Sequence, residues 1–283
     1  MNEHEPKSEQ PNKTKAKLRS VLLPAEHGVW ASLIEVITMG LIVGASWQSA
    51  YVGLMAILMG LCLQPFKLVV RGAPNKYQVP RIKIAQKALT LLAPLTVGII
   101  LLGSFSSWMQ PSFILPLMIA VPLVIVQWYY DAIGKPRALP GVFSGMLAIA
   151  TIAPAMLLAT RTEYRFAIAI YLVLAARQLS SIMYTRYVIR TMKKLPATIW
   201  GVIGMHKGCA LLIVLIYVVF PEIGSLIWIL VGSYLLLCIR AAIVIRLIHQ
   251  GQTFKAKQIG MSELLIGLIY IILTGSVLAS VTF

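Results

Sequence analysis

Charged side chains fall inside long apolar segments of this chain, where burying a charge is costly. Arg177 stands near the middle of one segment, Glu35 lies about 10 Å into another at 1.5 Å per residue, and Glu263 begins a third. A charge at mid-membrane depth costs at least about 2.5–3.5 kcal/mol and normally faces a bundle interior or a wet cavity. These positions therefore predict a shared polar site in which the arginine meets an anionic partner.

Arg177 is the residue that most needs a partner, because it lies too deep to reach the headgroup region easily. Helical spacing places Ser181 and Tyr184 on the same face of its helix. Besides the anion of a ligand, the acidic partners that the chain offers are Glu26, Glu35, Asp131 and Glu263. Three interpretations stay open: a structural ion pair between the sixth and first helices, a ligand-binding arginine, and a lipid-facing one.

Most polar residues of the apolar segments lie in the half that adjoins the basic connections. This pattern predicts one polar cavity that opens to the cytoplasm and is lined by several helices. For Glu26 and His27, a role in complementing the dipole of the first helix is the alternative to a role in the site. The candidate cavity residues are Glu26, His27, Trp30, Glu35, Arg71, Arg81, Gln127, Asp131, Arg177, Ser181, Tyr184, Lys193, His206 and Glu263.

Metal, cofactor and nucleophilic chemistry are not indicated. No two of His27, His206 and His249 share a helix at ligand spacing, and no Gly-x-Ser-x-Gly motif occurs. The three cysteines, Cys62, Cys209 and Cys238, are widely separated and are interpreted as packing thiols. We therefore predict no catalytic residue, no metal site and no cofactor; haem binding is the remote alternative.

The elements that position these residues are apolar helices. The 283 residues are 59% hydrophobic and 12% charged, whereas a soluble domain has about 25% charged residues. Runs of about 20 apolar residues, each long enough to cross a bilayer core, recur along the chain. The sequence predicts an all-α, polytopic membrane protein with nine spans at 28–47, 50–70, 85–103, 112–130, 141–159, 165–189, 202–220, 224–247 and 262–282.

The distribution of basic residues predicts the orientation. Most of the 25 lysines and arginines fall in alternate connections, which gives a cytoplasmic N-terminus and an extracytoplasmic C-terminus in a bacterial inner membrane. The net charge of +16 follows from this pattern, so no nucleic-acid partner is expected. Residues 1–20 lack an apolar signal region and are predicted to be a disordered cytoplasmic tail, followed by a membrane domain at 21–283.

Four segments resemble the YwiC-like family of bacterial polytopic membrane proteins, which is marked by a Glu-His-Gly-x-Trp motif and has no established biochemistry. The segments are "PAEHGVWASL" at 24–33, "KPRALPGVFSGMLAIA" at 135–150, "RQLSSIMYTRYVIR" at 177–190 and "KQIGMSELLIGLIYII" at 257–272. They occur in the same order as in that family and together span most of the chain beyond the tail.

A second and more distant resemblance is to the UbiA prenyltransferases. These enzymes have nine helices and a cavity that opens to the cytoplasm, and "YYDAIGKPRALPGVFSGML" at 129–147 looks like their junction between helices 4 and 5. The resemblance implies a UbiA-like bundle. The family uses two aspartate clusters to hold Mg²⁺ on a prenyl diphosphate, yet Asp131 is the one aspartate here and matches neither motif. Mg²⁺-dependent prenyl transfer is therefore not expected.

The function predicted from these observations is binding of an anionic amphiphile in the cytoplasm-facing cavity. An isoprenoid phosphate, a quinone precursor or an anionic lipid has the required chemistry, and membrane lipids are expected partners. A small-anion transporter and a respiratory or assembly accessory protein are the alternatives. The sequence favours no enzymatic activity and does not determine the oligomeric state.

Overall fold

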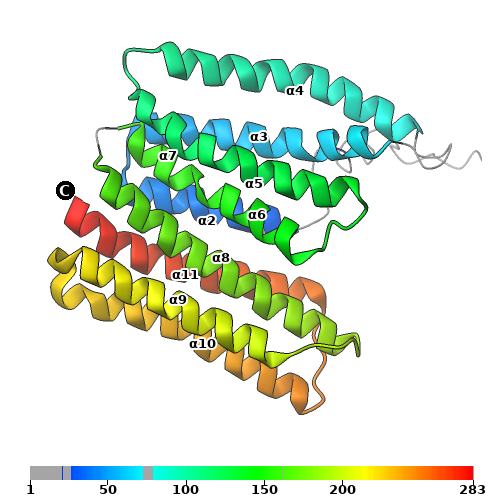
Figure 1. The fold of residues 1–283 in the computed structure, drawn as a ribbon, viewed down its shortest axis with the longest axis vertical. Helices are drawn as coiled ribbons and strands as arrows, with labels where there is room; N and C mark the ends of the chain where they lie inside the picture. Colours follow the sequence, from blue (N-terminus) through cyan, green and yellow to red (C-terminus); the bar gives the residue numbers. More distant parts are fainter. Residues whose placement is uncertain (1–20, 22–26, 73–78, 161, 283) are drawn as a thin grey trace, which may run out of the picture. The chain divides into compact units, whose positions relative to one another are not determined.

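The computed structural model describes residues 21, 27–72, 79–160 and 162–282 (Figure 1). Throughout this part of the chain the regular structure is helical, which confirms the predicted all-α fold class. Eight of its helical segments are long and apolar enough to cross a membrane, and a ninth apolar helix is shorter. The predicted tail at 1–20 and the candidate residue Glu26 lie outside the described residues.

Within the described residues, nine apolar helical segments follow the nine predicted spans in order. Several extend further at the end that carries the basic residues, as in α4, which begins at Val79 where the prediction began at 85. Lysine and arginine continue a helix beyond the apolar core, and a hydropathy pattern does not detect that part. The elements are α2 (His27–Val43), α3 (Trp47–Arg71), α4 (Val79–Phe105), η1 (Pro111–Phe113), α5 (Ile114–Ala132), α6 (Leu139–Ala150), α7 (Ile152–Leu158), α8 (Tyr164–Met192), α9 (Ile199–Val219), η2 (Pro221–Leu226), α10 (Ile227–His249) and α11 (Ala256–Thr282).

The fifth span differs from its prediction because it is interrupted. The sequence predicted one kinked helix at 141–159, whereas α6 ends at Ala150 and α7 begins at Ile152. Pro154 has no N–H to donate to the carbonyl of Ala150 and its ring clashes with that group, so the helix is broken one turn before the proline. The Thr151 hydroxyl donates to the carbonyl of Ala148 at the junction, over 2.7 Å.

The chain divides into two compact units. Among the described residues, the smaller unit contains residue 21, the second part of α3 from residue 58, and α4 up to residue 98. Within this unit the Cys62 thiol lies 3.5 Å from the Thr96 hydroxyl. The larger unit comprises residues 27–57 and 99–282 of the described chain, and it contains the cluster of buried charges.

Helix α8 forms the centre of the larger unit. It contacts α6, α7, α9, α10 and α11, and two thirds of its most apolar stretch is buried. Helix α11 in turn packs between α2 and α10. This arrangement brings the first, sixth, eighth and ninth spans together, so polar residues on their inner faces meet inside the bundle.

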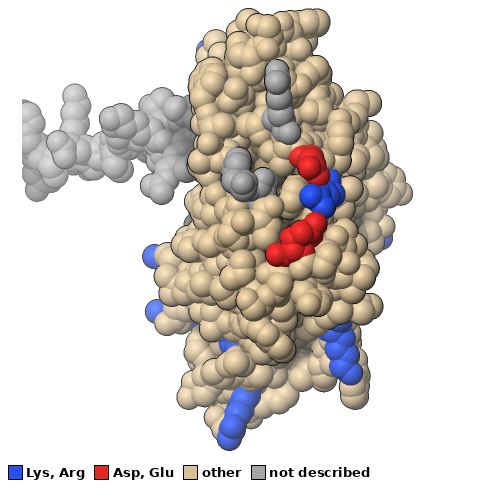
Figure 2. Space-filling view, turned by 90° about the vertical axis from the view of Figure 1, so that its left-hand side faces the viewer, with Lys and Arg blue, Asp and Glu red and all other residues tan. Residues whose placement is uncertain are grey.

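Basic residues collect at one end of the larger unit. Figure 1 shows that α2, α6, α9 and α11 begin at the end where α5, α8 and α10 finish. The basic residues there are Lys135, Arg137, Arg190, Lys193, Lys194, Arg246, Lys255 and Lys257. Figure 2 shows the opposite end, where acidic and basic atoms form one small group amid mostly uncharged residues. At this end, Arg165 in the first turn of α8 pairs with Glu163 at 2.7 Å and with Glu222 of η2 at 3.1 Å.

Candidate functional site: a buried cluster of two arginines and two glutamates

Arg177 of α8 pairs with acidic residues from two other helices, α2 and α11. Its Nη2 donates to Oε1 of Glu35 in α2 over 2.9 Å, and its Nη1 donates to Oε2 of Glu263 in α11 over 3.1 Å. The same Nη2 also donates to the backbone carbonyl of Glu263 at 2.9 Å. The side chains of Arg177 and Glu35 are each 3% exposed. The guanidinium thus joins three helices away from water.

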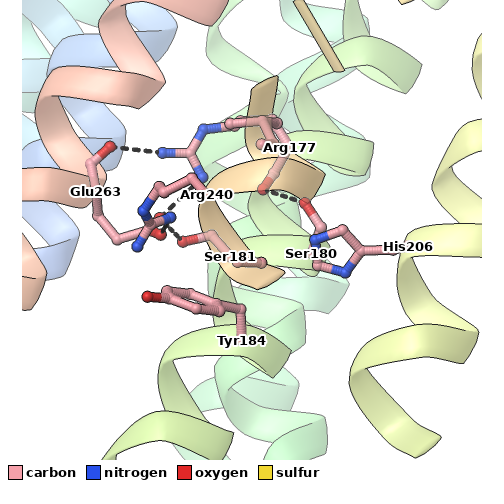
Figure 3. Close-up of a pocket in the computed structure, with 9 residues that line it drawn as sticks. Arg177, Ser180, Ser181, Tyr184, His206, Arg240 and Glu263 are labelled. Atoms are coloured by element: carbon pink, nitrogen blue, oxygen red, sulfur yellow. Dashed lines mark hydrogen bonds and ion pairs between the residues drawn. The ribbon is translucent and has the colours of Figure 1, made fainter. Parts of the chain in front are cut away.

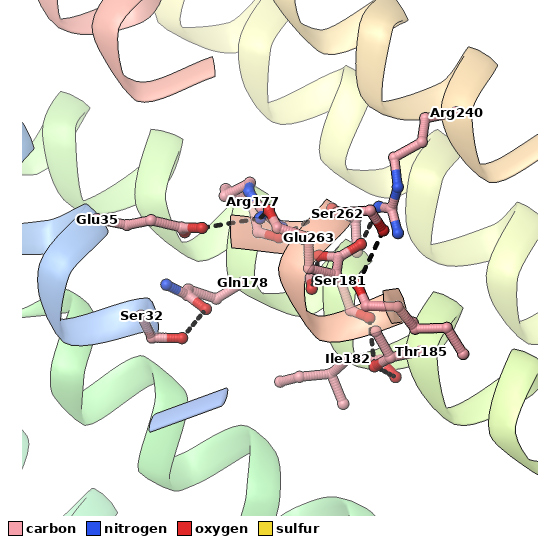
Figure 4. A network of polar contacts seen from close by, with 12 residues as sticks. Ser32, Glu35, Arg177, Gln178, Ser181, Ile182, Thr185, Arg240, Ser262 and Glu263 are labelled. Atoms are coloured by element: carbon pink, nitrogen blue, oxygen red, sulfur yellow. Dashed lines mark hydrogen bonds and ion pairs between the residues drawn. The ribbon is translucent and has the colours of Figure 1, made fainter. Parts of the chain in front are cut away.

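Glu263 is shared between two arginines (Figure 4). One carboxylate oxygen, Oε2, accepts from Arg177 and from the Ser181 hydroxyl, one turn further along α8. The other oxygen, Oε1, accepts from Nη1 of Arg240 in α10. Because both carboxylate oxygens have cationic partners, Glu263 is the residue that connects α8 with α10 electrostatically.

The four charged side chains balance, with two guanidinium groups and two carboxylates. Removing ions from water costs several kcal/mol for each ion, and only close pairing with further hydrogen bonds offsets that cost. Here the Glu263 backbone carbonyl and the Ser181 hydroxyl supply such bonds. The pairing explains how Glu35, about 12 Å along α2 from His27, is tolerated in an apolar helix.

Gly267, one turn beyond Glu263 in α11, allows this close approach. A Cβ atom at this position would overlap the Glu35 carboxylate and the Arg177 guanidinium. Glycine is the residue that leaves room where polar groups must approach a helix backbone this closely. The ion pair therefore depends on a residue that carries no functional group.

A hydrogen bond extends the network toward the next turn of α2. The Ser32 hydroxyl donates to Oε1 of Gln178 over 2.9 Å (Figure 4). Gln178 follows Arg177 in sequence, and both of these buried side chains point toward α2. The contacts of Ser32 and Glu35, one turn apart, fix the position of α2 along α8.

A small pocket, with about 10 Å³ of free space, adjoins the cluster (Figure 3). Four helices contribute to it, namely α8, α9, α10 and α11. Its lining residues are Arg177, Ser180, Ser181, Tyr184, His206, Leu237, Arg240, Ala241 and Glu263. Arg240 lies about 13 Å along α10 from its basic end, at 1.5 Å per residue, so the pocket lies within the spans.

Hydrogen-bond donors in this pocket are left unpaired. Arg240 uses Nη1 for Glu263, whereas its Nε and Nη2 are buried and have no hydrogen-bond partner among the described residues. The Tyr184 hydroxyl is likewise buried without one. The guanidinium carbon lies 4.2 Å from the centre of the Tyr184 ring, so stacking holds the arginine in place. A fixed cation with two free N–H groups is suited to binding an anion.

His206 lines the same pocket. Its Nδ1 lies 3.0 Å from the backbone carbonyl of Val202. A carbonyl oxygen only accepts hydrogen bonds, so Nδ1 carries a proton in this contact, and in the neutral imidazole Nε2 is an acceptor. The pocket thus combines this acceptor with four unpaired donor atoms: Nε of Arg177, Nε and Nη2 of Arg240, and the Tyr184 hydroxyl.

The structure brings together six of the fourteen candidate residues. Glu35, Arg177, Ser181, Tyr184, His206 and Glu263 belong to the cluster or line its pocket. The acidic partners of Arg177 are thus Glu35 and Glu263, which gives the predicted ion pair between the sixth and first spans. Whether any of these residues binds a ligand remains a prediction.

The other candidates lie elsewhere or cannot be placed. The Gln127 amide packs against Gly145, and Asp131 is buried near the end of α5. Lys193 is exposed where α8 ends, Arg81 belongs to the smaller unit, and Trp30 is half-buried in α2. Glu26 and the side chains of His27 and Arg71 lie outside the described part of the structure.

Several residues of the site were absent from the predicted set, among them Arg240, Gln178 and Gly267. Arg240 carried the same signal as Arg177, since it too is an arginine deep within an apolar span. Gln178 is a buried amide adjacent to Arg177 and could have been included for the same reason. Gly267 carried no usable signal, because a glycine in a membrane helix is common and its neighbours are known only from packing.

Comparison with known proteins supports one of the two resemblances. A family model described as YwiC-like protein matches residues 23–157, which confirms the resemblance to that family over this part of the chain. The matched region contains Glu35, whereas Arg177, Arg240 and Glu263 lie beyond it. No curated protein and no solved structure matches the chain significantly. A UbiA-like arrangement of the helices therefore stays a prediction.

Proposed function

We propose that this YwiC-like membrane protein binds the anionic head of an amphiphilic molecule in the pocket beside Arg240. The observation that carries the proposal is the unpaired edge of that guanidinium, formed by Nε and Nη2. A buried donor without a partner costs about 1–3 kcal/mol, and more when it is charged. Two oxygen atoms of a ligand would pair with these two donors and remove that cost.

The position of the pocket favours an amphiphile. Leu237 and Ala241 add apolar surface to a lining that otherwise presents charged and polar groups. The surrounding helices expose large apolar side chains, among them Leu235 and Ile239 of α10, which suit the acyl region of a bilayer. An anionic head at Arg240 would therefore have apolar surroundings for its tail.

Basic residues near the same end support recruitment of an anion. Lys193 and Lys194 follow α8, and Lys255 and Lys257 lie around the start of α11. Each basic residue near a membrane surface contributes about 1 kcal/mol of attraction to anionic headgroups. In the predicted orientation these residues face the cytoplasm, so the ligand would enter from that side.

The donor set supports binding rather than Mg²⁺-dependent transfer. Magnesium sites use carboxylates as hard oxygen ligands beside the substrate phosphates. In the described part of the pocket the carboxylate is Glu263, and both of its oxygens already accept from guanidinium groups. A cation would have to displace an arginine to reach it.

A structural role is the second candidate function, and the charge balance of the cluster favours it. Two arginines and two glutamates satisfy one another without any ligand charge. In this case the cluster would only hold the helices of a scaffold or accessory protein in register. The free edge of Arg240 distinguishes the two candidates, because a purely structural role gives it no use.

Co-purified lipid tests the proposal. The protein is purified in mild detergent, extracted with organic solvent and analysed by mass spectrometry, alongside Arg240→Gln and the control Arg165→Gln. We expect an anionic amphiphile in the wild-type and control extracts that is depleted at least about tenfold in Arg240→Gln. Circular dichroism and thermal unfolding establish that each variant is folded. Equal amounts in all three folded proteins would contradict the proposal.

A further inference from the structure

The pocket beside Arg240 also indicates the chemical class of the ligand. We infer that the group bound there is a carboxylate with a single negative charge, rather than a phosphate or diphosphate. This inference rests on the proposed function and narrows it. Three features of the pocket carry the argument: its charge balance, the geometry of its unpaired donors, and its size.

The charge balance favours the smallest anionic charge. The cluster is neutral before a ligand enters, so every negative charge of the ligand adds to the net charge of a buried site. A carboxylate adds one charge, whereas a phosphate monoester carries about −1.5 to −2 at pH 7. Because uncompensated buried charge is strongly unfavourable, the carboxylate has the lower cost.

The unpaired guanidinium donors in the pocket also favour a carboxylate. Both Nη atoms of Arg177 are already engaged by Glu35 and Glu263, which leaves its Nε as a single unpaired donor. In the described pocket, the adjacent Nε and Nη2 of Arg240 are therefore the pair of unpaired donors on one guanidinium. An arginine fork matches the two oxygens of one carboxylate, with two parallel N–H···O bonds. A diphosphate would need several such groups.

The remaining polar atoms fit a two-oxygen head. The Tyr184 hydroxyl is buried without a hydrogen-bond partner among the described residues, and its ring lies beneath the guanidinium, so it would provide a further donor for one carboxylate oxygen. A phosphate monoester would bring three terminal oxygens, and each one left without a donor costs desolvation energy. His206 presents an acceptor nitrogen, which repels a further anionic oxygen and would accept from a hydroxyl or N–H of the ligand.

The size of the pocket favours a small head group. Its free space is about 10 Å³, close to what one water molecule needs, so the lining side chains must move apart to admit a ligand. A carboxylate is smaller than a phosphate and requires less of this movement. The same head occurs on fatty acids and on short free carboxylates, so the experiment must separate these two sources.

Competition binding tests the inference with wild-type protein in phosphatidylcholine nanodiscs. Binding of radiolabelled laurate is measured against empty nanodiscs, with unlabelled laurate, dodecyl phosphate, dodecanol and butyrate as competitors. We expect laurate to compete at least about tenfold better than dodecyl phosphate or dodecanol. Neither of these competitors combines a single negative charge with two oxygens that pair with the two donors of Arg240. Weak competition by butyrate would assign the source to an amphiphile.

Variants assign the binding to this pocket. Arg240→Lys keeps the charge but loses the fork, so laurate affinity falls about tenfold and less than in Arg240→Gln. Tyr184→Phe removes one donor and weakens binding about three- to tenfold. Arg165→Gln, at the opposite end of α8, leaves the affinity unchanged.

Each other outcome contradicts a specific part of the account. Tighter binding of dodecyl phosphate than of laurate would overturn the carboxylate assignment and leave anion binding intact. Butyrate that competes as well as laurate would keep the carboxylate but overturn the amphiphile. Absence of binding for laurate and dodecyl phosphate alike, with folded protein, would overturn the proposed function itself.

Discussion

The guanidinium of Arg177 lies 2.9 Å from the carboxylate of Glu35, although 142 residues separate the two in sequence. The pair joins the central helix α8 to α2, and both side chains are almost completely buried. Removing one partner of a buried pair leaves an uncompensated charge, whereas removing both does not. The stability of the larger unit should therefore depend on the two residues together.

The loss of stability on substituting both residues of this pair is predicted to be smaller than the sum of the losses from the two single substitutions. Glu35→Gln should lower the free energy of unfolding by about 3–5 kcal/mol, because Arg177 then lacks one of its anionic partners. Glu35→Gln combined with Arg177→Met should cost less than the sum of the two single changes. Chemical unfolding in detergent, followed by circular dichroism, measures the coupling.

The control for this cycle is the exposed ion pair between Arg165 and Glu222, whose side chains are 46% and 53% exposed. Solvent screens exposed pairs, which contribute little to stability, so Arg165→Gln and Glu222→Gln should each have little effect. Simple additivity for Glu35 and Arg177 would show that their contact is not energetically coupled.

Gly267 is predicted to be intolerant of alanine. The added methyl group would meet the Glu35 carboxylate and the Arg177 guanidinium, so the ion pair or the packing of α2 on α11 must shift. We expect Gly267→Ala to destabilise the protein by about 1–3 kcal/mol, the usual cost of overpacking.

Gly260→Ala in the same helix provides the matched control. Its Cβ would have no neighbour within 4 Å, and alanine favours helix by about 1 kcal/mol over glycine. The control should therefore be neutral or stabilising in thermal unfolding. Similar losses at both glycines would mean that the close approach at Gly267 has no special importance.

The spans were predictable because bilayer thickness fixes their length and composition shows where they lie. The interruption between α6 and α7 was not predicted, since a membrane proline such as Pro154 often bends a helix without ending it. The identity of Arg177's partners could only be narrowed to four acids. Which of them it meets depends on helix packing, and Glu35 and Glu263 lie on helices that periodicity alone cannot place beside α8.

Orientation in the membrane is predicted from the basic end of the larger unit. Single cysteines at Gln252 and Ser107, in a background where Cys62, Cys209 and Cys238 are replaced, report opposite ends of the helices. An impermeant maleimide added to intact cells should label Ser107→Cys. It should label Gln252→Cys only after the cells are permeabilised. The reverse pattern would place the basic end, and the entry side of the proposed ligand, outside the cell.

Ser181→Ala is predicted to have a smaller effect than changes at the arginines. Its hydroxyl donates to Glu263, yet that carboxylate keeps both guanidinium partners when the serine is lost. We expect a loss of about 1–2 kcal/mol in unfolding free energy. A loss as large as that of Glu35→Gln would show that the serine, rather than the arginines, dominates the stability of Glu263.

The most direct test of the central claim is the effect of laurate on the thermal unfolding midpoint of wild-type protein and of Arg240→Gln. A ligand that binds the folded state stabilises it by about 2.7 kcal/mol at a hundred times its Kd. We predict a saturable rise in the midpoint for wild type and for Arg165→Gln, and none for Arg240→Gln. An equal rise in all three proteins, or none in wild type, would contradict the claim that the free edge of Arg240 binds an anion.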